Sequence, residues 1–215
     1  QARRMLRRVS PGDRAFGIAR IHLRKHLGGV DRAIAQVPKH LLMDPGLMYE
    51  RLRWRRKKGR NVSALNILIN APENMVRTDL WSRERVILAR RLLVKGQISE
   101  AYQALKNHGL DTGHRLQLAE AEWLAGWIAL RYLNDPNEAK RRFERLFRTV
   151  FYPVSKSRAA YWAGRAASTL AEFNLAHDWY KRAASHPTTY HGQLAIEALG
   201  QNLSPMPDRI TLNSE

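Results

Sequence analysis

Residues 135–150 read DPNEAKRRFERLFRTV, and this stretch decides the fold. Apart from Pro136, its apolar residues are Ala139, Phe143, Leu146, Phe147 and Val150. They recur at positions i, i+4, i+7, i+8 and i+11, which is the spacing of one helical face. Asp135 stands before Pro136, and an acidic N-cap followed by proline at the first helical position is a typical helix start. The stretch therefore predicts an amphipathic helix that packs through its apolar face.

A small residue followed by a bulky one four positions later recurs along the chain. The four alanines are Ala64, Ala101, Ala139 and Ala176, and their partners are Leu68, Leu105, Phe143 and Tyr180. The steps between the alanines are 37, 38 and 37 residues. Residues at i and i+4 share a helical face, so each pair predicts a point where a helix meets its neighbour. Repeats of this length, each a pair of helices, are typical of a helical solenoid.

The predicted fold class is all-α: an α-α superhelix built from TPR-like helix pairs, curved or ring-like. No stretch alternates apolar and polar residues in the manner of a strand. We expect one superhelical domain over residues 1–200, with a strongly basic part at 1–60 and helix-pair repeats at 61–200. Residues 201–215 are expected to be a linker. The expected helices cover residues 2–10, 15–27, a segment from Asp31 as N-cap, 47–58, a segment capped by Asn61 or Ser63, 83–95, 98–109, 116–133, 135–150, 157–171 and 174–185.

The charge of the chain is large and unevenly distributed. The 215 residues carry a formal charge of +18, and residues 1–60 hold 17 Lys/Arg against four Asp/Glu. This asymmetry predicts a polyanionic partner for the N-terminal part: nucleic acid, anionic lipid or an acidic polymer. Cysteine is absent, which excludes disulfides, thiolate catalysis and cysteine-based zinc sites. No stretch approaches the roughly 20 apolar residues of a membrane span.

Several segments resemble one known family. They are residues 160–167 (AYWAGRAA), 176–180 (AHDWY) and 186–195 (HPTTYHGQLA), with earlier ones at 44–54 (DPGLMYERLRW) and 119–127 (AEAEWLAGW). Together they resemble the α-superhelical domain of soluble lytic murein transglycosylases, over most of residues 30–200. The GQLA block is the most specific piece. One departure is Tyr190-His191, where the family pattern has two adjacent aromatic residues.

The resemblance implies a periplasmic protein and no metal or organic cofactor. In this family a lysozyme-like domain follows the superhelix and cleaves the MurNAc–GlcNAc bond of peptidoglycan to a 1,6-anhydro product, with one glutamic acid as acid and then base. The Glu-Ser pair and the Gly-Leu-Met-Gln-type segment of that domain are absent here. We therefore expect a lytic transglycosylase, a lyase, as the parent enzyme, and a chain that lacks the catalytic domain, is inert by itself and binds peptidoglycan.

The densest basic run is the candidate binding site for the anionic wall polymer. It consists of Arg51, Arg53, Arg55, Arg56, Lys57, Lys58 and Arg60. In the functional interpretation these side chains contact carboxylates of the murein peptides, and Trp54 stacks on a sugar. In the alternative they form a solvated helix face, with Trp54 buried between repeats. We favour burial for Trp54 and leave the basic side chains undecided.

No catalytic or metal-binding constellation stands out. His22 and His26 are spaced i, i+4 but have no carboxylate at a helpful position, so a metal site is not predicted. Glu120 and Glu122 point to different sides of a helix, and no carboxylate has the apolar setting that raises a pKa for acid catalysis. The alternative function is a helical-repeat adaptor or RNA-binding solenoid, which the charge of +18 also favours.

Overall fold

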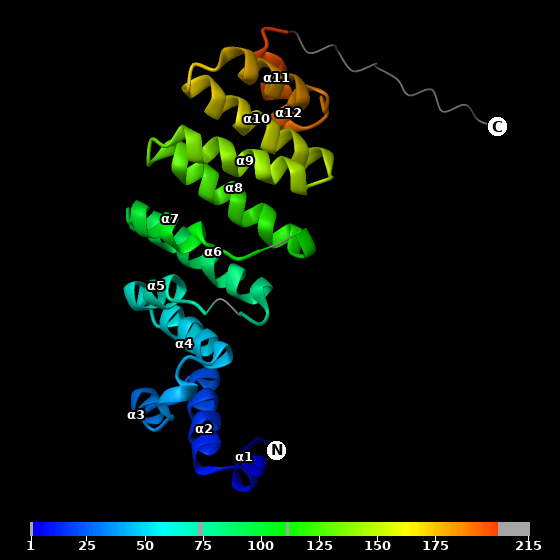
Figure 1. Cartoon of the computed structure of the whole chain (residues 1–215). Helices are drawn as coiled ribbons and strands as arrows, with labels where there is room; N and C mark the ends of the chain where they lie inside the picture. Colours follow the sequence, from blue (N-terminus) through cyan, green and yellow to red (C-terminus); the bar gives the residue numbers. More distant parts are fainter. Residues whose placement is uncertain (1, 73–74, 111, 202–215) are drawn as a thin grey trace, which may run out of the picture. The chain divides into compact units, whose positions relative to one another are not determined.

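The structure is a computed structural model that describes residues 2–72, 75–110 and 112–201. Every regular element in these ranges is a helix, which confirms the all-α prediction (Figure 1). The chain divides into two compact units, the first ending at Ala121 and the second beginning at Glu122. Helices that follow one another in sequence pack together within each unit, as in a helical solenoid. None of the described helices is long and apolar enough to span a membrane.

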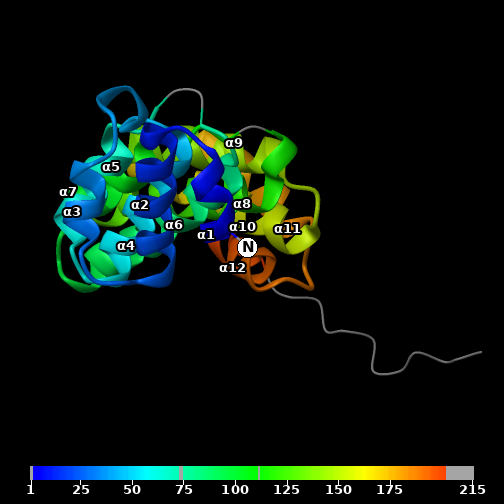
Figure 2. The same ribbon diagram turned by 90° about the horizontal axis from the view of Figure 1, so that it is seen from below.

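The first unit is built around α2, α4 and α6. Its helices are α1 (Ala2–Met5), α2 (Pro11–Lys25), α3 (Val30–Ala35), α4 (Pro45–Lys57), α5 (Asn61–Ile69), α6 (Thr78–Val94) and α7 (Ile98–Lys106), with 3-10 turns at Leu6–Arg8, Lys39–Leu41 and Thr112–His114. Helix α4 packs against α2, α5 and α6, and α7 packs against α5 and α6. Figure 2 shows α2 and α4 side by side. The pair α4/α5 is thus followed by the pair α6/α7, with the predicted spacing.

The second unit is centred on α10. Helix α8 (Arg115–Arg131) continues into it from the first unit, and it also contains α9 (Pro136–Thr149), α10 (Pro153–Thr169), α11 (Phe173–Ala184) and α12 (Tyr190–Ala198). Helix α10 packs against α9, α11 and α12, and α11 also packs against α12. Apart from Gln201, the linker predicted at 201–215 lies outside the described residues.

The recurring alanine pairs mark helix contacts, as the spacing predicts. All four alanines are buried, the most exposed being Ala176 at 3%. In the second unit the bulky partner of each pair packs against a glycine of the preceding helix. A Cβ on Gly126 would lie 2.9 Å from Phe143 Cε1, and one on Gly164 would lie 2.7 Å from Tyr180 Cε1. The glycines lie 38 residues apart, so the period reflects one repeated packing contact.

Some predicted helix starts are confirmed and others are wrong. Asp135 caps α9, since its carboxylate accepts a hydrogen bond of 2.9 Å from the Glu138 amide. Asp31 is not a cap, because α3 already begins at Val30, after Gly29 in the left-handed conformation. The residue before α5 is Arg60, without a side-chain cap, so the predicted cap at Asn61 or Ser63 is wrong. Proline supplies the first residue of α4 and α10, and both helices start earlier than expected.

Helix α12 was not predicted, and its start explains the GQLA block. Thr189 caps the helix, because its hydroxyl accepts a hydrogen bond from the Gly192 amide. The same hydroxyl lies 2.8 Å from Ser157 Oγ on α10 and 2.8 Å from the His186 carbonyl oxygen, and it can donate to either. A Cβ on Gly192 would lie 2.0 Å from the His186 carbonyl oxygen, which is backbone. Glycine is therefore required where α12 crosses this turn.

We expect Gly192→Ala to destabilise the protein by about 2 kcal/mol or more, because backbone must move to admit the methyl group. The measurement is a chemical denaturation curve of the parent and the variant. Gly28→Ala is the control, since a Cβ there would meet nothing within 4 Å. Equal stability of the Gly192 variant and the parent would contradict the contact.

Candidate anion-binding site

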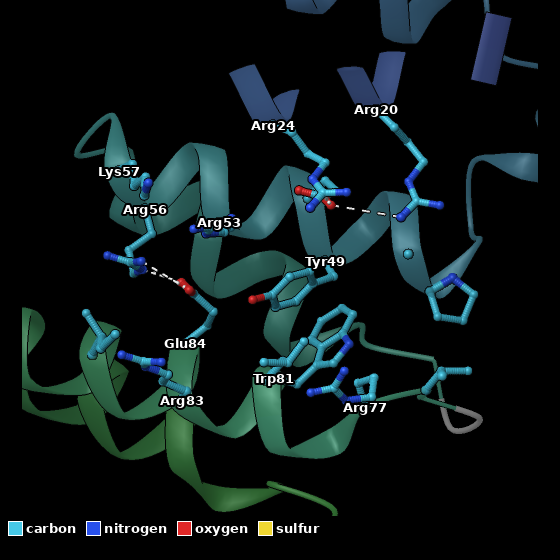
Figure 3. A pocket seen from close by; sticks show the side chains of 16 residues that line it. Arg20, Arg24, Tyr49, Arg53, Arg56, Lys57, Arg77, Trp81, Arg83 and Glu84 are labelled. Atoms are coloured by element: carbon cyan, nitrogen blue, oxygen red, sulfur yellow. Dashed lines mark hydrogen bonds and ion pairs between the residues drawn. The ribbon is translucent and has the colours of Figure 1, made fainter. Parts of the chain in front are cut away.

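A basic pocket of about 570 Å³ lies between α2, α4 and α6 in the first unit (Figure 3). Its cationic lining residues are Arg20, Arg24, Arg53, Arg56, Lys57, Arg77 and Arg83. Among the described residues, two carboxylates line it, Glu50 and Glu84. The pocket is thus strongly cationic, and its size suits a compact ligand rather than a single ion.

The helical period brings the cations together. On α4 the lining residues include Tyr49, Arg53 and Lys57, at successive i, i+4 positions along one stripe. On α2, Arg20 and Arg24 have the same spacing and point toward α4 (Figure 3). The first turn of α4 is close to α2, since a Cβ on Gly46 would lie 3.1 Å from Arg20 Nη2.

Arg56 is buried and neutralised, so it does not belong to the free charge of the pocket. Its side chain forms a two-point ion pair with Glu84 on α6, in which Nη2 donates to Oε1 at 3.1 Å and Nε donates to Oε2. Arg56 is 6% exposed and Glu84 4% exposed. Both interpretations of the basic run require exposed side chains, and both are therefore wrong for Arg56. A buried guanidinium needs a paired carboxylate, and Glu84 supplies it from the neighbouring helix.

Glu50 is buried beneath the two arginines of α2. Its Oε1 lies 3.4 Å from Arg24 Nε and 3.9 Å from Arg20 Nη2, and the carboxylate accepts no hydrogen bond from any described residue. Burial raises the pKa of Glu50, although Arg24, Arg20 and Arg53 act in the opposite direction. The sequence did not predict this raised pKa, and the setting of Glu50 is cationic rather than the apolar one that the prediction excluded. Glu50 is a buried acceptor with unused hydrogen-bonding capacity.

Three lining cations are left without a counter-ion. Arg53, Lys57 and Arg83 form no ion pair with any residue that the structure describes. Arg77 differs from them, because it pairs with Asp79 at 2.9 Å. These uncompensated charges come from α4 and α6, and Arg83 of α6 lies across the pocket from the α2 arginines (Figure 3).

The aromatic side chains of the pocket differ in exposure. Trp81 is 1% exposed and packs against Tyr49 with ring centroids 5.8 Å apart. Tyr49 is half-buried, and burial raises the pKa of its hydroxyl, which is therefore protonated at neutral pH. Its hydroxyl adds one neutral hydrogen-bonding group to a lining of charges.

The rest of the predicted basic run lies outside the pocket. These residues are Arg51, Arg55, Lys58 and Arg60. Arg55 donates to the Ser63 carbonyl at 3.1 Å, and Arg60 lies over the Trp54 ring at 5.0 Å. Trp54 itself is buried in the apolar cluster of α2, α3 and α4, which confirms the favoured interpretation. The run is contiguous in sequence, but the helix distributes it over different faces.

Other candidate groups show ordinary structural roles. His22 Nδ1 lies 2.9 Å from the Gly28 carbonyl oxygen. Glu120 pairs with Arg90, whereas Glu122 is fully buried and contacts Arg145 Nη1 at 2.9 Å. The two glutamates thus differ in environment and do not form an acid/base pair. In the described ranges, no group of three His, Asp or Glu side chains is placed to hold a metal ion.

Comparisons with known proteins add no family assignment. No protein-family model, no curated protein and no solved structure matches this chain. Sequence reasoning identified Arg53, Arg56 and Lys57 of the pocket but missed Arg20, Arg24 and Arg83. The i, i+4 spacing of the two α2 arginines was visible in the sequence, but their position above α4 was not.

We expect Glu84→Gln to lower the free energy of unfolding by about 3 kcal/mol, because Arg56 keeps a buried charge without its partner. The measurement is urea denaturation. The double variant Arg56→Met/Glu84→Met should recover at least half of the loss, since it buries no lone charge. Glu100→Gln on α7 is the control and should cost less than about 1 kcal/mol. A double variant as unstable as the single one would contradict this role.

Glu50→Gln tests the raised pKa. The folded pKa lies above the ordinary value of 4.5, so ionisation of Glu50 lowers the stability of the fold as pH rises through that interval. The variant cannot ionise and escapes this loss. Its free energy of unfolding relative to the parent should therefore increase from acidic to neutral pH. Unfolding curves at several pH values measure it, and a difference that falls with pH would contradict it.

Proposed function

We propose that this chain is the non-catalytic superhelical scaffold of a periplasmic soluble lytic murein transglycosylase, and that it holds the cutting domain on peptidoglycan. The observation that carries the binding part of the proposal is the basic pocket, with Arg53, Lys57 and Arg83 lacking counter-ions among the described residues. Such a surface attracts the carboxylates of an anionic wall polymer. The family part is supported by the resemblance of the sequence segments, the GQLA block above all.

The packing supports the proposal in two further ways. Consecutive helices stack through a repeated contact, the arrangement from which a superhelical scaffold is built. The GQLA block, the most specific segment of the resemblance, has a defined structural task at Thr189 and Gly192. A scaffold acts through its shape and its charge, and it requires no catalytic group.

Glu50 does not turn the pocket into an active site. Its Oε1 lies 3.4 Å from Arg24 Nε and 3.9 Å from Arg20 Nη2, and these two guanidinium groups favour the ionised carboxylate, whereas a general acid must carry a proton. The cutting step therefore belongs to the lysozyme-like domain of the family, and this chain supplies attachment.

A second candidate function is RNA binding by a helical-repeat solenoid. The convergence of arginines favours it, because guanidinium groups match phosphate as well as carboxylate geometry. Retention of generic RNA on a filter at physiological salt would support this function and count against the scaffold. If RNA is not retained at that salt concentration, RNA binding is contradicted.

We expect the chain to sediment with purified peptidoglycan sacculi and to release no muropeptides. Raising the salt concentration should lower the bound fraction, since the contacts are between exposed charges. Arg53→Gln/Arg83→Gln should reduce binding several-fold, whereas Lys39→Gln/Lys95→Gln removes the same charge outside the pocket and should change it little. Quantified pellet fractions measure this. Absence of sedimentation, or anhydro-muropeptides released by this chain, would overturn the proposed function.

A further inference from the structure

The pocket contains two kinds of unused hydrogen-bonding capacity. Arg53, Lys57 and Arg83 are donors without anionic partners among the described residues. Glu50 is an acceptor held only by ion pairs at 3.4 and 3.9 Å, longer than a charge-assisted hydrogen bond. A ligand that satisfied both kinds would need anionic oxygens and at least one N–H donor.

We propose that the pocket between α2, α4 and α6 binds a short acidic peptide, which presents carboxylates to the arginines and an N–H or ammonium group to Glu50. The half-buried Tyr49 beside Glu50 offers its ring edge and hydroxyl to the peptide backbone. The volume of about 570 Å³ suits a few amino-acid residues.

The shape of the site favours a branch or chain end over a polymer backbone. A uniform polyanion is usually bound along a groove that follows its backbone. This pocket is instead lined by cations from three helices, α2, α4 and α6 (Figure 3). A volume of about 570 Å³ suits a compact group that projects from a polymer better than a continuous strand.

Glu50 distinguishes a peptide from a phosphate. The oxygens of a phosphate ligand are mostly deprotonated acceptors near neutral pH, so the Glu50 carboxylate would repel it and gain few hydrogen bonds from it. A peptide brings amide N–H groups and, when its amino group is free, an ammonium. Burial raises the pKa of Glu50, which fits a carboxylate that lacks such a donor in the free protein.

This inference deepens the proposed function and rests on it for the source of the ligand. If the chain attaches to peptidoglycan, the peptide branches of that polymer are the acidic peptides within reach. The glycan would then be held through its branches, and attachment would depend on which carboxylates of the branch are free.

Calorimetric titration of the whole chain tests the proposal with three probes: the tripeptide alanyl-glutamyl-diaminopimelate, the same peptide with its carboxylates amidated, and tripolyphosphate. We expect saturable binding of the free tripeptide and about tenfold or greater loss on amidation. Arg53→Gln/Arg83→Gln should weaken the tripeptide by about tenfold, because two charge-assisted contacts are lost. Lys39→Gln/Lys95→Gln is the matched control and should leave the affinity within about twofold.

Glu50→Gln gives the discriminating result. It should weaken the tripeptide several-fold and strengthen tripolyphosphate, since it removes an acceptor for one and a repulsion for the other. If Glu50→Gln alters the helical circular dichroism spectrum, Glu50→Asp takes its place: the retained charge on a shorter side chain should weaken the tripeptide without strengthening tripolyphosphate. A tripeptide that does not saturate, or whose affinity rises in Glu50→Gln, would overturn the proposal.

The two proposals fail in different ways. A chain that sediments with sacculi but does not bind the tripeptide would overturn the pocket assignment and leave the scaffold function in place. A chain that binds the tripeptide but ignores sacculi would overturn the scaffold function and leave the pocket as a peptide site.

Discussion

Helix α6 is held in the first unit by two buried guanidinium groups, and the pocket depends on its position. Arg85 is 2% exposed and donates to the Leu68 carbonyl at the end of α5 and to the Ala104 carbonyl in α7. Burial lowers its pKa to about 10, so it remains charged at neutral pH. Arg56 joins α4 to the same helix through Glu84. Because buried charges require these partners, few relative placements of α4, α5, α6 and α7 satisfy them.

The basic residues of the first unit thus serve two different purposes. Arg56 and Arg85 serve the fold, since Arg56 pairs with the buried Glu84 and the two Nη atoms of Arg85 donate to buried backbone carbonyls. Arg53 and Arg83 lie on the same helices, one turn or less away, yet they form no ion pair with any described residue. Arg83 and Arg85 are two positions apart and so point to different sides of α6, whereas Arg53 and Arg56 share a face of α4 and differ because Glu84 pairs with Arg56. The formal charge of the chain therefore overstates the charge that a partner meets.

A pocket rich in cations with one buried carboxylate is selective in a way that a basic surface is not. A surface of lysines and arginines attracts any polyanion, and its binding is set mainly by charge number and salt. The Glu50 carboxylate repels ligands that present only hydrogen-bond acceptors, and it accepts a hydrogen bond from ligands that also present a donor. The proposed attachment to peptidoglycan needs this kind of selectivity, because other polyanions share the same negative charge.

The sequence by itself determined the all-α class, the register of the repeats and the cap at Asp135, because each depends on residues within a few turns of one another. It also identified the basic run, but it did not show which of these side chains are buried and which are exposed. The structure shows that Arg56 is buried, and the packing of α4 against α6 places Glu84 beside it. The α12 start and the pocket were decided by tertiary structure alone. Thr189 meets Ser157 across 32 residues, and the pocket joins α2 to α6. Such contacts depend on how helices pack, and local periodicity carries no information about that.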